Sequence, residues 1–248
     1  MQVIQSNKTQ TYTKNDFERA IDAVDEIETM PVVAQRLLQL SADPEFDMNT
    51  LQHLVQSDPV IAAKILRVAS SPFYGSRPAS NLRAALIRIG MRDLKKLVLA
   101  SAMVGHMRNK FTDQLWRYSM QVAAVSEAIA HWVATRDLDD PFLCGLLHDF
   151  GAVVMNKAIG KDYRELITDP GAEGQREAEA EAYGFDHCDL GVMVANKWKL
   201  FDALEDVMQH HHDPLVVELL GLSDASQSAV FVVSLARLAV LEYPDEQE

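Results

Sequence analysis

The most constraining stretch of this 248-residue chain is an apolar run that ends in a histidine and an aspartate. Residues 141–151 read PFLCGLLHDFG, and no charged side chain precedes Asp149 in this run. Such a run predicts a buried helix, which we expect to start at Asp139-Asp140-Pro141 and to continue through Met155. A carboxylate at the inner end of a buried helix is costly unless a metal ion, a cation or several hydrogen bonds stabilise it. His148 and Asp149 are therefore either metal ligands or a pair that caps and orders a core helix.

More histidines follow at the ends of two downstream helical segments. His187 lies at the start of one segment, and residues 210–212 are three consecutive histidines at the end of another. Imidazoles and a carboxylate carried by separate helices suit a site in the core of a helical bundle. The alternative for the three histidines is a helix cap over the last carbonyl groups, and we prefer it for His210 and His212.

The rest of the chain predicts an all-α protein with two helical lobes. Apolar residues recur at helical spacing, and the first half contains no strand-like alternation of useful length. Helix boundaries are indicated by Asp58-Pro59 and Ser80 as starts and by Gly90 as an end. We expect a flexible arm over 1–13, an N-terminal helical lobe over 14–110, a second helical lobe over 111–242 and an acidic tail over 243–248.

Composition narrows the function classes. The net charge of −13 argues against general nucleic-acid binding. Cys144 and Cys188 show neither paired zinc spacing nor a disulfide framework, so we interpret them as reduced, buried residues. No apolar run is expected to approach membrane-spanning length, and the polar N-terminus is not typical of a signal peptide. These features predict a cytoplasmic protein that does not act on a membrane.

One basic strip stands out on this acidic chain. It could dock an acidic partner or a phosphate-bearing ligand such as a nucleotide, and the alternative is an ordinary solvated helix face. The strip contains Arg77, Arg83, Arg88, Arg92, Lys95 and Lys96.

Several segments together resemble HDOD domains, the HD-related output domains of bacterial signalling proteins. The resemblance covers roughly residues 15–240. It implies an all-α fold related to the HD phosphohydrolase bundle, in regulatory modules without demonstrated catalysis. The matching segments are Asp58-Pro59, ILRVASSPFYG at 65–75, residues 84–90 and 94–100, FLCGLLHDFG at 142–151, YGFDH at 183–187 and HHDP at 211–214.

In catalytic HD enzymes the resemblance implies a metal held by an early His, the His-Asp pair, later histidines and a late Asp. His148, Asp149, His187 and His211 match this pattern. Tyr118 occupies the place of the early His and Arg237 that of the late Asp. A neutral tyrosine is a poor ligand, and an arginine has no lone pair to give.

These departures suggest a hypothesis about Arg237. Its guanidinium could stand in the place of the metal ion and pair with Asp149, since the planar group suits bidentate pairing with a carboxylate. The alternative is an Arg237 that points to solvent.

The resemblance and the lost ligand positions favour a regulatory module that binds a signalling partner, through the groove between the lobes or through the basic strip. The competing hypothesis is a metal-dependent phosphohydrolase of the HD type, using one ion of iron, zinc, manganese or nickel. Against it, Ala152 stands where the related HD-GYP enzymes carry a lysine. A third hypothesis is a structural metal site without turnover.

Overall fold

In the computed structural model, the described residues are 14–25, 33, 36–37, 47–74, 79–104, 109–133, 138 and 140–242. They form helices joined by turns and contain no strand, which confirms the all-α class. The predicted arm (1–13), the predicted tail (243–248) and Arg77 lie outside them. The helices are α1 (Lys14–Asp25), α3 (Met48–Gln56), α4 (Pro59–Ala69), α5 (Leu82–Val104), α6 (Lys110–Val133), α7 (Pro141–Leu147), α8 (Phe150–Ile159), α9 (Lys161–Leu166), α10 (Gln175–Tyr183), α11 (His187–Trp198), α12 (Asp202–His210), α13 (Val216–Leu219) and α14 (Asp224–Glu242).

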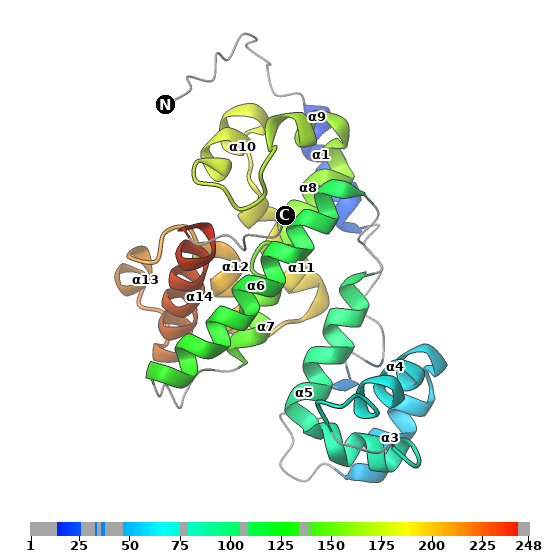
Figure 1. Cartoon of the computed structure of the whole chain (residues 1–248). Coiled ribbons are helices and arrows are strands. Elements are labelled where there is room, and N and C mark those ends of the chain that lie inside the picture. Colours follow the sequence, from blue (N-terminus) through cyan, green and yellow to red (C-terminus); the bar gives the residue numbers. More distant parts are fainter. Residues whose placement is uncertain are drawn as a thin grey trace. The chain divides into compact units, whose positions relative to one another are not determined.

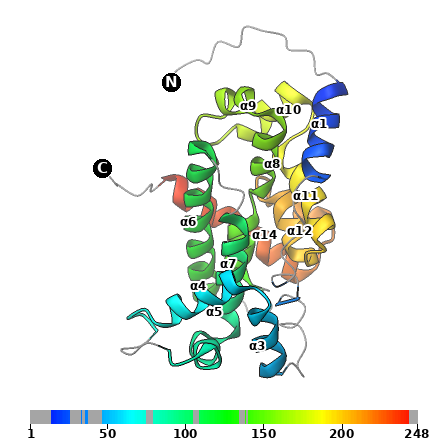
Figure 2. The same cartoon turned by 90° about the vertical axis from the view of Figure 1, so that its right-hand side faces the viewer.

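The helices fall into two compact units. One unit contains α3, α4 and α5, and the other contains α1 together with α6 to α14. The sequence placed α1 in a lobe spanning 14–110, whereas in the structure α1 packs against α8 and α11 (Figure 2). The ammonium of Lys197 on α11 donates to the carbonyl oxygens of Val24 and Asp25 at 2.7 and 2.6 Å. Lys197 therefore satisfies carbonyl groups at the C-terminus of α1 and ties this helix to the larger unit.

The smaller unit follows its sequence signals closely. Asp58 accepts hydrogen bonds from the backbone N–H groups of Val60 and Ile61, and the first turn of α4 contains a proline, as predicted. Gly90 interrupts α5 with φ of 78°, a conformation that favours glycine. One prediction was wrong: Asn81, not Ser80, caps α5, because the Asn81 side chain accepts from the backbone N–H of residue 84 at 2.8 Å.

The larger unit is a bundle around the long helix α6. Helix α6 runs beside α7 and α14 (Figure 1), α8 packs on α11, and α12 packs against α11 and α14. The largest fully buried side chains of the core are Tyr163 and Phe150, which lie among mostly aliphatic residues. Every residue of the candidate metal site lies in this unit.

The single helix predicted from residue 141 to Met155 is instead two helices. Helix α7 ends at Leu147 and α8 begins at Phe150, with Asp149 at φ of −108° and ψ of 19°. A Cβ on Gly145 would lie 2.7 Å from the Cα of Ala123 on α6, whereas a Cβ on Gly151 would overlap the backbone of α11. The two glycines thus pack against different helices. The chain changes direction between them, at the His-Asp pair.

Two segments are long and apolar enough to cross a membrane by length and composition, Pro141–Ile159 and Asp224–Glu242. The expectation that no run approaches this length was therefore wrong. The first segment is broken at the His-Asp pair, and 78% of its most apolar window is buried inside the unit. Core helices of a bundle have the same composition, because they are apolar on every side.

Candidate metal centre

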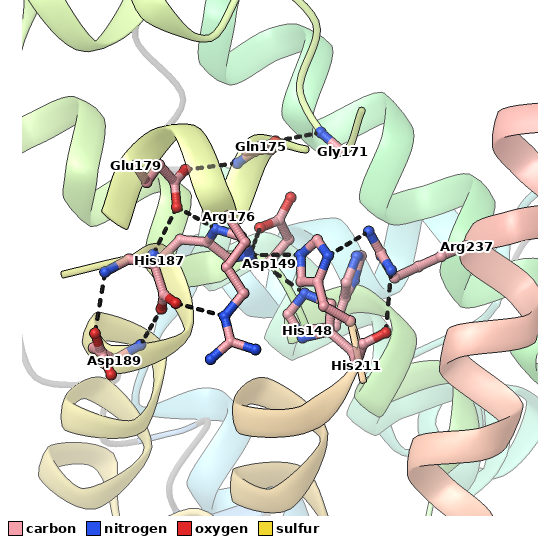
Figure 3. A network of polar contacts seen from close by, with 12 residues as sticks. His148, Asp149, Gly171, Gln175, Arg176, Glu179, His187, Asp189, His211 and Arg237 are labelled. Carbon is pink, nitrogen blue, oxygen red and sulfur yellow. Dashed lines mark hydrogen bonds and ion pairs between the residues drawn. The ribbon is translucent and has the colours of Figure 1, made fainter. Parts of the chain in front are cut away.

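The structure brings the four matched residues His148, Asp149, His187 and His211 together (Figure 3). Nε2 of His187 lies 3.3 Å from Oδ1 of Asp149 and 3.4 Å from Nε2 of His211. The rings of His148 and His211 are edge to face, with centroids 4.9 Å apart. These side chains come from the α7–α8 junction, the first residue of α11 and the end of α12, so the helix ends converge on one point.

Each of the three imidazoles is oriented by an oxygen that contacts its Nδ1. His148 contacts the carbonyl of Gly145 at 2.7 Å, and His211 contacts the carbonyl of Val207 at 2.9 Å. Nδ1 of His187 lies 2.6 Å from a carboxylate oxygen on α10. Because carbonyl and carboxylate oxygens only accept, Nδ1 carries the hydrogen and Nε2 keeps its lone pair. Metal-binding histidines are typically held in this way.

The carboxylate that orients His187 is Glu179, which the sequence analysis did not single out. Its Oε2 also accepts from the backbone N–H of His187 at 2.9 Å. Its Oε1 accepts from the Tyr163 hydroxyl at 2.6 Å and from the Gln175 amide at 2.9 Å. The one available signal was the spacing of Gln175 and Glu179, which places two polar side chains on one helical face.

A capping box fixes the start of α11. The side chains of Asp186 and Asp189 each accept from the backbone N–H of the other, and Arg176 pairs with Asp186. The carboxylate at the N-cap also complements the helix dipole. His187 follows the cap directly, so this local motif determines where its ring enters the core, and the sequence had placed His187 at the start of a helical segment.

Burial sets the protonation behaviour of the cluster. Burial, aided by the charge of Arg237, lowers the pKa of His148 to about 3. Burial raises the pKa of Asp149 to about 6, although the neighbouring His187 opposes that shift. Burial lowers the pKa of His187, but Cys188, Glu179 and Asp149 raise it, and the net direction is upward. His187 therefore has the most basic Nε2 of the cluster, and His148 stays neutral.

Two of the matched residues carry polar atoms without a hydrogen-bond partner among the described residues. They are Nε2 of His148 and both carboxylate oxygens of Asp149. Leaving such atoms buried and unpaired costs about 1–3 kcal/mol each, and a bound cation would relieve it. Neutral imidazoles and a carboxylate are also ligands that first-row transition metals accept. The donor set therefore fits a divalent transition-metal ion.

Arg237 does not do what the sequence suggested. Its nitrogens contact the carbonyl oxygen of His211 and Nδ1 of His212, each at 3.1 Å, and no ion pair among the described residues joins it to Asp149. The solvent-facing alternative is wrong as well, because Arg237 is only 6% exposed. Ser234, one turn earlier on α14, also donates to the His211 carbonyl at 2.9 Å. Helix α14 therefore fixes the end of α12.

Tyr118, at the place of the early His, faces the cluster from α6. Its ring centroid lies 5.6 Å from that of His148. Burial raises the pKa of Tyr118 to about 12, so the hydroxyl stays neutral and is a poor metal ligand. On its other side the ring touches Gly171, where any Cβ would overlap it. The Tyr118 ring thus contacts both the His148 ring and the loop that precedes α10.

His212 belongs to the cluster, contrary to its interpretation as a helix cap. Its Nε2 lies 3.0 Å from Nε2 of His187. The donor atoms of His187, Cys188, His211 and His212 all lie within 4.8 Å of one another. Cys188 was interpreted as a small buried residue, and it is buried. Its proximity to the cluster depends on the fold around His187, which the sequence spacing did not reveal.

The basic strip is in the smaller unit and is partly engaged there. Arg83 donates to the Asn49 side chain at 2.6 Å, and Arg88 donates to the carbonyl of Ala69 at 2.9 Å. Lys96 lies 3.9 Å and Arg92 3.5 Å from Asp93. Arg92 has a side chain that is 77% exposed. The described residues of the basic strip therefore do not form one continuous row of solvent-exposed side chains.

The fold and the cluster define a class of protein: an all-helical module with a histidine and carboxylate cluster at converging helix ends. The HDOD domain model matches residues 27–214. The chain belongs to the HDOD domain family.

The chain is also similar to individual proteins. A crystal structure of an HDOD domain protein of unknown function from Geobacter sulfurreducens is 27% identical, with a TM-score of 0.75, and the match covers 91% of this chain and 76% of that one. A protein from Shewanella amazonensis SB2B, named as a proposed phosphohydrolase, is 23% identical with a TM-score of 0.68, covering 93% and 82% of the two chains. An uncharacterized protein of Treponema pallidum (strain Nichols) is 24% identical over 227 residues. That match covers 86% of this chain but only 43% of the Treponema protein.

Proposed function

We propose that this chain is a signalling module that acts by binding a partner protein, and that its histidine cluster is not a hydrolytic centre. The observation that carries the proposal is the burial of the cluster. His148, His187 and His211 are each 1% exposed and Asp149 is 2% exposed. Metal-assisted hydrolysis needs a substrate phosphoryl group beside the metal-bound water, and donors this deeply buried are not open to a phosphate ester.

The residues that close the cluster are those that depart from the catalytic pattern. Tyr118 packs against Gly171, and Arg237 is buried beside the cluster. Both are bulkier than the ligands whose places they take. A metal ion held by His148, Asp149, His187 and His211 would act as a Lewis acid towards water or phosphate if these could reach it. In this buried setting the same four residues would instead hold helix ends together, as in a structural metal site.

The smaller unit carries the surface that best suits a partner. Phe73 is 85% exposed, and its ring is edge to face with Tyr74 at 4.9 Å. The Tyr74 hydroxyl donates to Asp93 at 2.9 Å, and Asp93 also lies beside Arg92. Phe73 packs on Tyr74, and Tyr74 and Arg92 both contact Asp93. Exposed aromatic and arginine side chains are the residue types that dominate binding energy at protein interfaces. We infer that an acidic segment of a partner protein docks here, since Arg92, Lys95 and Lys96 make the neighbouring helix face basic.

The catalytic alternative has a direct test. We expect the protein, loaded in turn with Fe²⁺, Mn²⁺, Ni²⁺ and Zn²⁺, to hydrolyse phosphomonoesters and linear or cyclic nucleotides no faster than its His148→Ala variant. The measurement is product release under identical metal loading, with bound metal quantified by elemental mass spectrometry. Turnover by the wild type that disappears in both His148→Ala and Asp149→Asn would establish a phosphohydrolase and contradict the proposal.

The partner surface predicts a separate result. Phe73→Ala and Arg92→Glu should each weaken partner binding, by about tenfold or more if these residues are hot spots. Proximity labelling in the native host would identify the partners, and purified candidates would then be measured by calorimetry. Trp132→Ala is a matched control, because Trp132 is an exposed aromatic residue of the other unit. Equal binding by the wild type, Phe73→Ala and Arg92→Glu would show that the partner docks elsewhere.

A further inference from the structure

The hydrogen-bond directions within the cluster are determined by Arg237. A guanidinium only donates, so Nδ1 of His212, 3.1 Å from an Arg237 nitrogen, must offer its lone pair. The hydrogen of a neutral His212 ring is then on Nε2. Arg237 therefore selects one tautomer of His212.

In that tautomer the Nε2–H group of His212 points at Nε2 of His187, the atom that would bind a metal ion. Nε2 of His212 lies 3.0 Å from Nε2 of His187. The lone pair on Nε2 of His187 accepts this N–H, since the contact meets hydrogen-bond geometry and neither oxygen of Asp149 forms a hydrogen bond with that nitrogen. The other ring nitrogen of His187 donates to Glu179 at 2.6 Å. The hydrogen bonds thus run in one direction, from Arg237 through His212 and His187 to Glu179.

We propose that Arg237 and His212 form an internal plug, in which Arg237 holds the His212 N–H against His187 and so closes the histidine cluster to metal ions. Two consequences of the geometry act together. The lone pair of His187 is already used, and a buried positive charge lies beside the cluster, where it opposes a second cation. The second contact of Arg237, to the His211 carbonyl at 3.1 Å, keeps the end of α12 in place.

The plug changes which residues count as metal donors. Proximity alone groups His212 and Cys188 with His187 and His211. Arg237 removes His212 from that group, because its Nε2 carries a hydrogen. Once the plug is released, the unpaired atoms of His148 and Asp149 can complete a site with His187 and His211. This inference rests on that donor set, whether or not the protein acts by binding a partner.

The test is metal affinity, measured on the full chain by titration with Zn²⁺ in calorimetry and with Co²⁺ by its visible absorption. His212→Ala and Arg237→Asp should each bind the ion about 10- to 100-fold more tightly than the wild type, the range that partners of metal-binding histidines typically control. Because both substitutions release the same plug, the combined variant should gain less than the product of the two effects. Adding His148→Ala to His212→Ala should abolish the gain.

Two controls match the substitutions. His210→Ala removes a neighbouring, half-buried histidine, and Arg176→Gln removes the arginine that pairs with Asp186 instead. Neither should raise metal affinity. If Arg237→Asp does not fold, as judged by circular dichroism, His212→Ala decides the question alone. Weaker metal binding by His212→Ala would make His212 a ligand and overturn the plug, and so would an unchanged affinity. Neither outcome depends on hydrolysis or on partner binding, so the proposed function stands or falls separately.

Discussion

Replacing Gly151 with alanine is expected to destabilise the protein by about 3 kcal/mol or more, the upper end of the range for overpacked cores. A Cβ at this position would overlap the carbonyl oxygen of His187 and lie 2.8 Å from the backbone nitrogen of Gly191. These are backbone atoms of α11, so no side-chain rotation relieves the contact. The better helix propensity of alanine, about 1 kcal/mol, is too small to offset it. Helices α8 and α11 would have to separate.

The measurement is the free energy of unfolding from urea denaturation, followed by circular dichroism. Gly191→Ala is the matched control, because a Cβ at Gly191 would meet only the Met208 side chain, at 3.4 Å, which is ordinary contact. That variant should be as stable as the wild type or slightly more stable. Equal stability of Gly151→Ala and Gly191→Ala would show that the two helices do not approach as closely as described.

The second large effect is expected at Glu179. Glu179→Ala should lower the free energy of unfolding by about 3–5 kcal/mol, as is typical when one member of a buried charged pair is removed. The variant would leave Nδ1 of His187, its backbone N–H and the Tyr163 hydroxyl without their acceptor. Glu179→Gln keeps the shape and should cost less. Glu181→Gln, on the exposed side of the same helix, should change stability by no more than about 0.5 kcal/mol.

The effect of Glu179 should depend on pH with a definite sign. Burial raises the pKa of Glu179, but His187 and the hydrogen bonds outweigh burial, and the net pKa is lowered from 4.5. A lowered pKa stabilises the fold above the pKa of the unfolded chain, and the stabilisation is lost as pH falls through the folded value. The stability difference between the wild type and Glu179→Gln should therefore be largest between about pH 6 and about pH 5 and shrink below about pH 4.5. A difference that grows on acidification would contradict the role given to Glu179.

Local sequence signals predicted helix ends well when the cap and the helix are adjacent in the chain. Asp58 caps α4, Gly90 interrupts α5 and His187 begins α11, as expected from the local sequence. The same signals missed the break at Asp149. That break depends on Gly145 and Gly151 packing against different helices, which is a tertiary property.

The same difference between local and tertiary signals applies to the residues of the candidate site. The His-Asp pair, His187 and His211 could be named from the sequence because each belongs to a short motif. Glu179 and His212 could not, because what distinguishes them is a partner far away in the chain. The family resemblance likewise indicated that Arg237 is unsuited to bind a metal, but the hypothesis drawn from it gave Arg237 the wrong partner, since only the packing of α14 against α12 determines what its guanidinium reaches.

The sequence by itself determined that this protein is all-helical, that it carries a histidine and carboxylate constellation, and that it resembles HDOD domains, because periodicity, caps and motifs are local. The tertiary structure alone decided that the constellation is buried, that Glu179 orients His187, and that His212 and Arg237 lie over it. Hydrogen-bond direction and burial depend on which helix ends converge, and that convergence results from packing between segments distant in the chain.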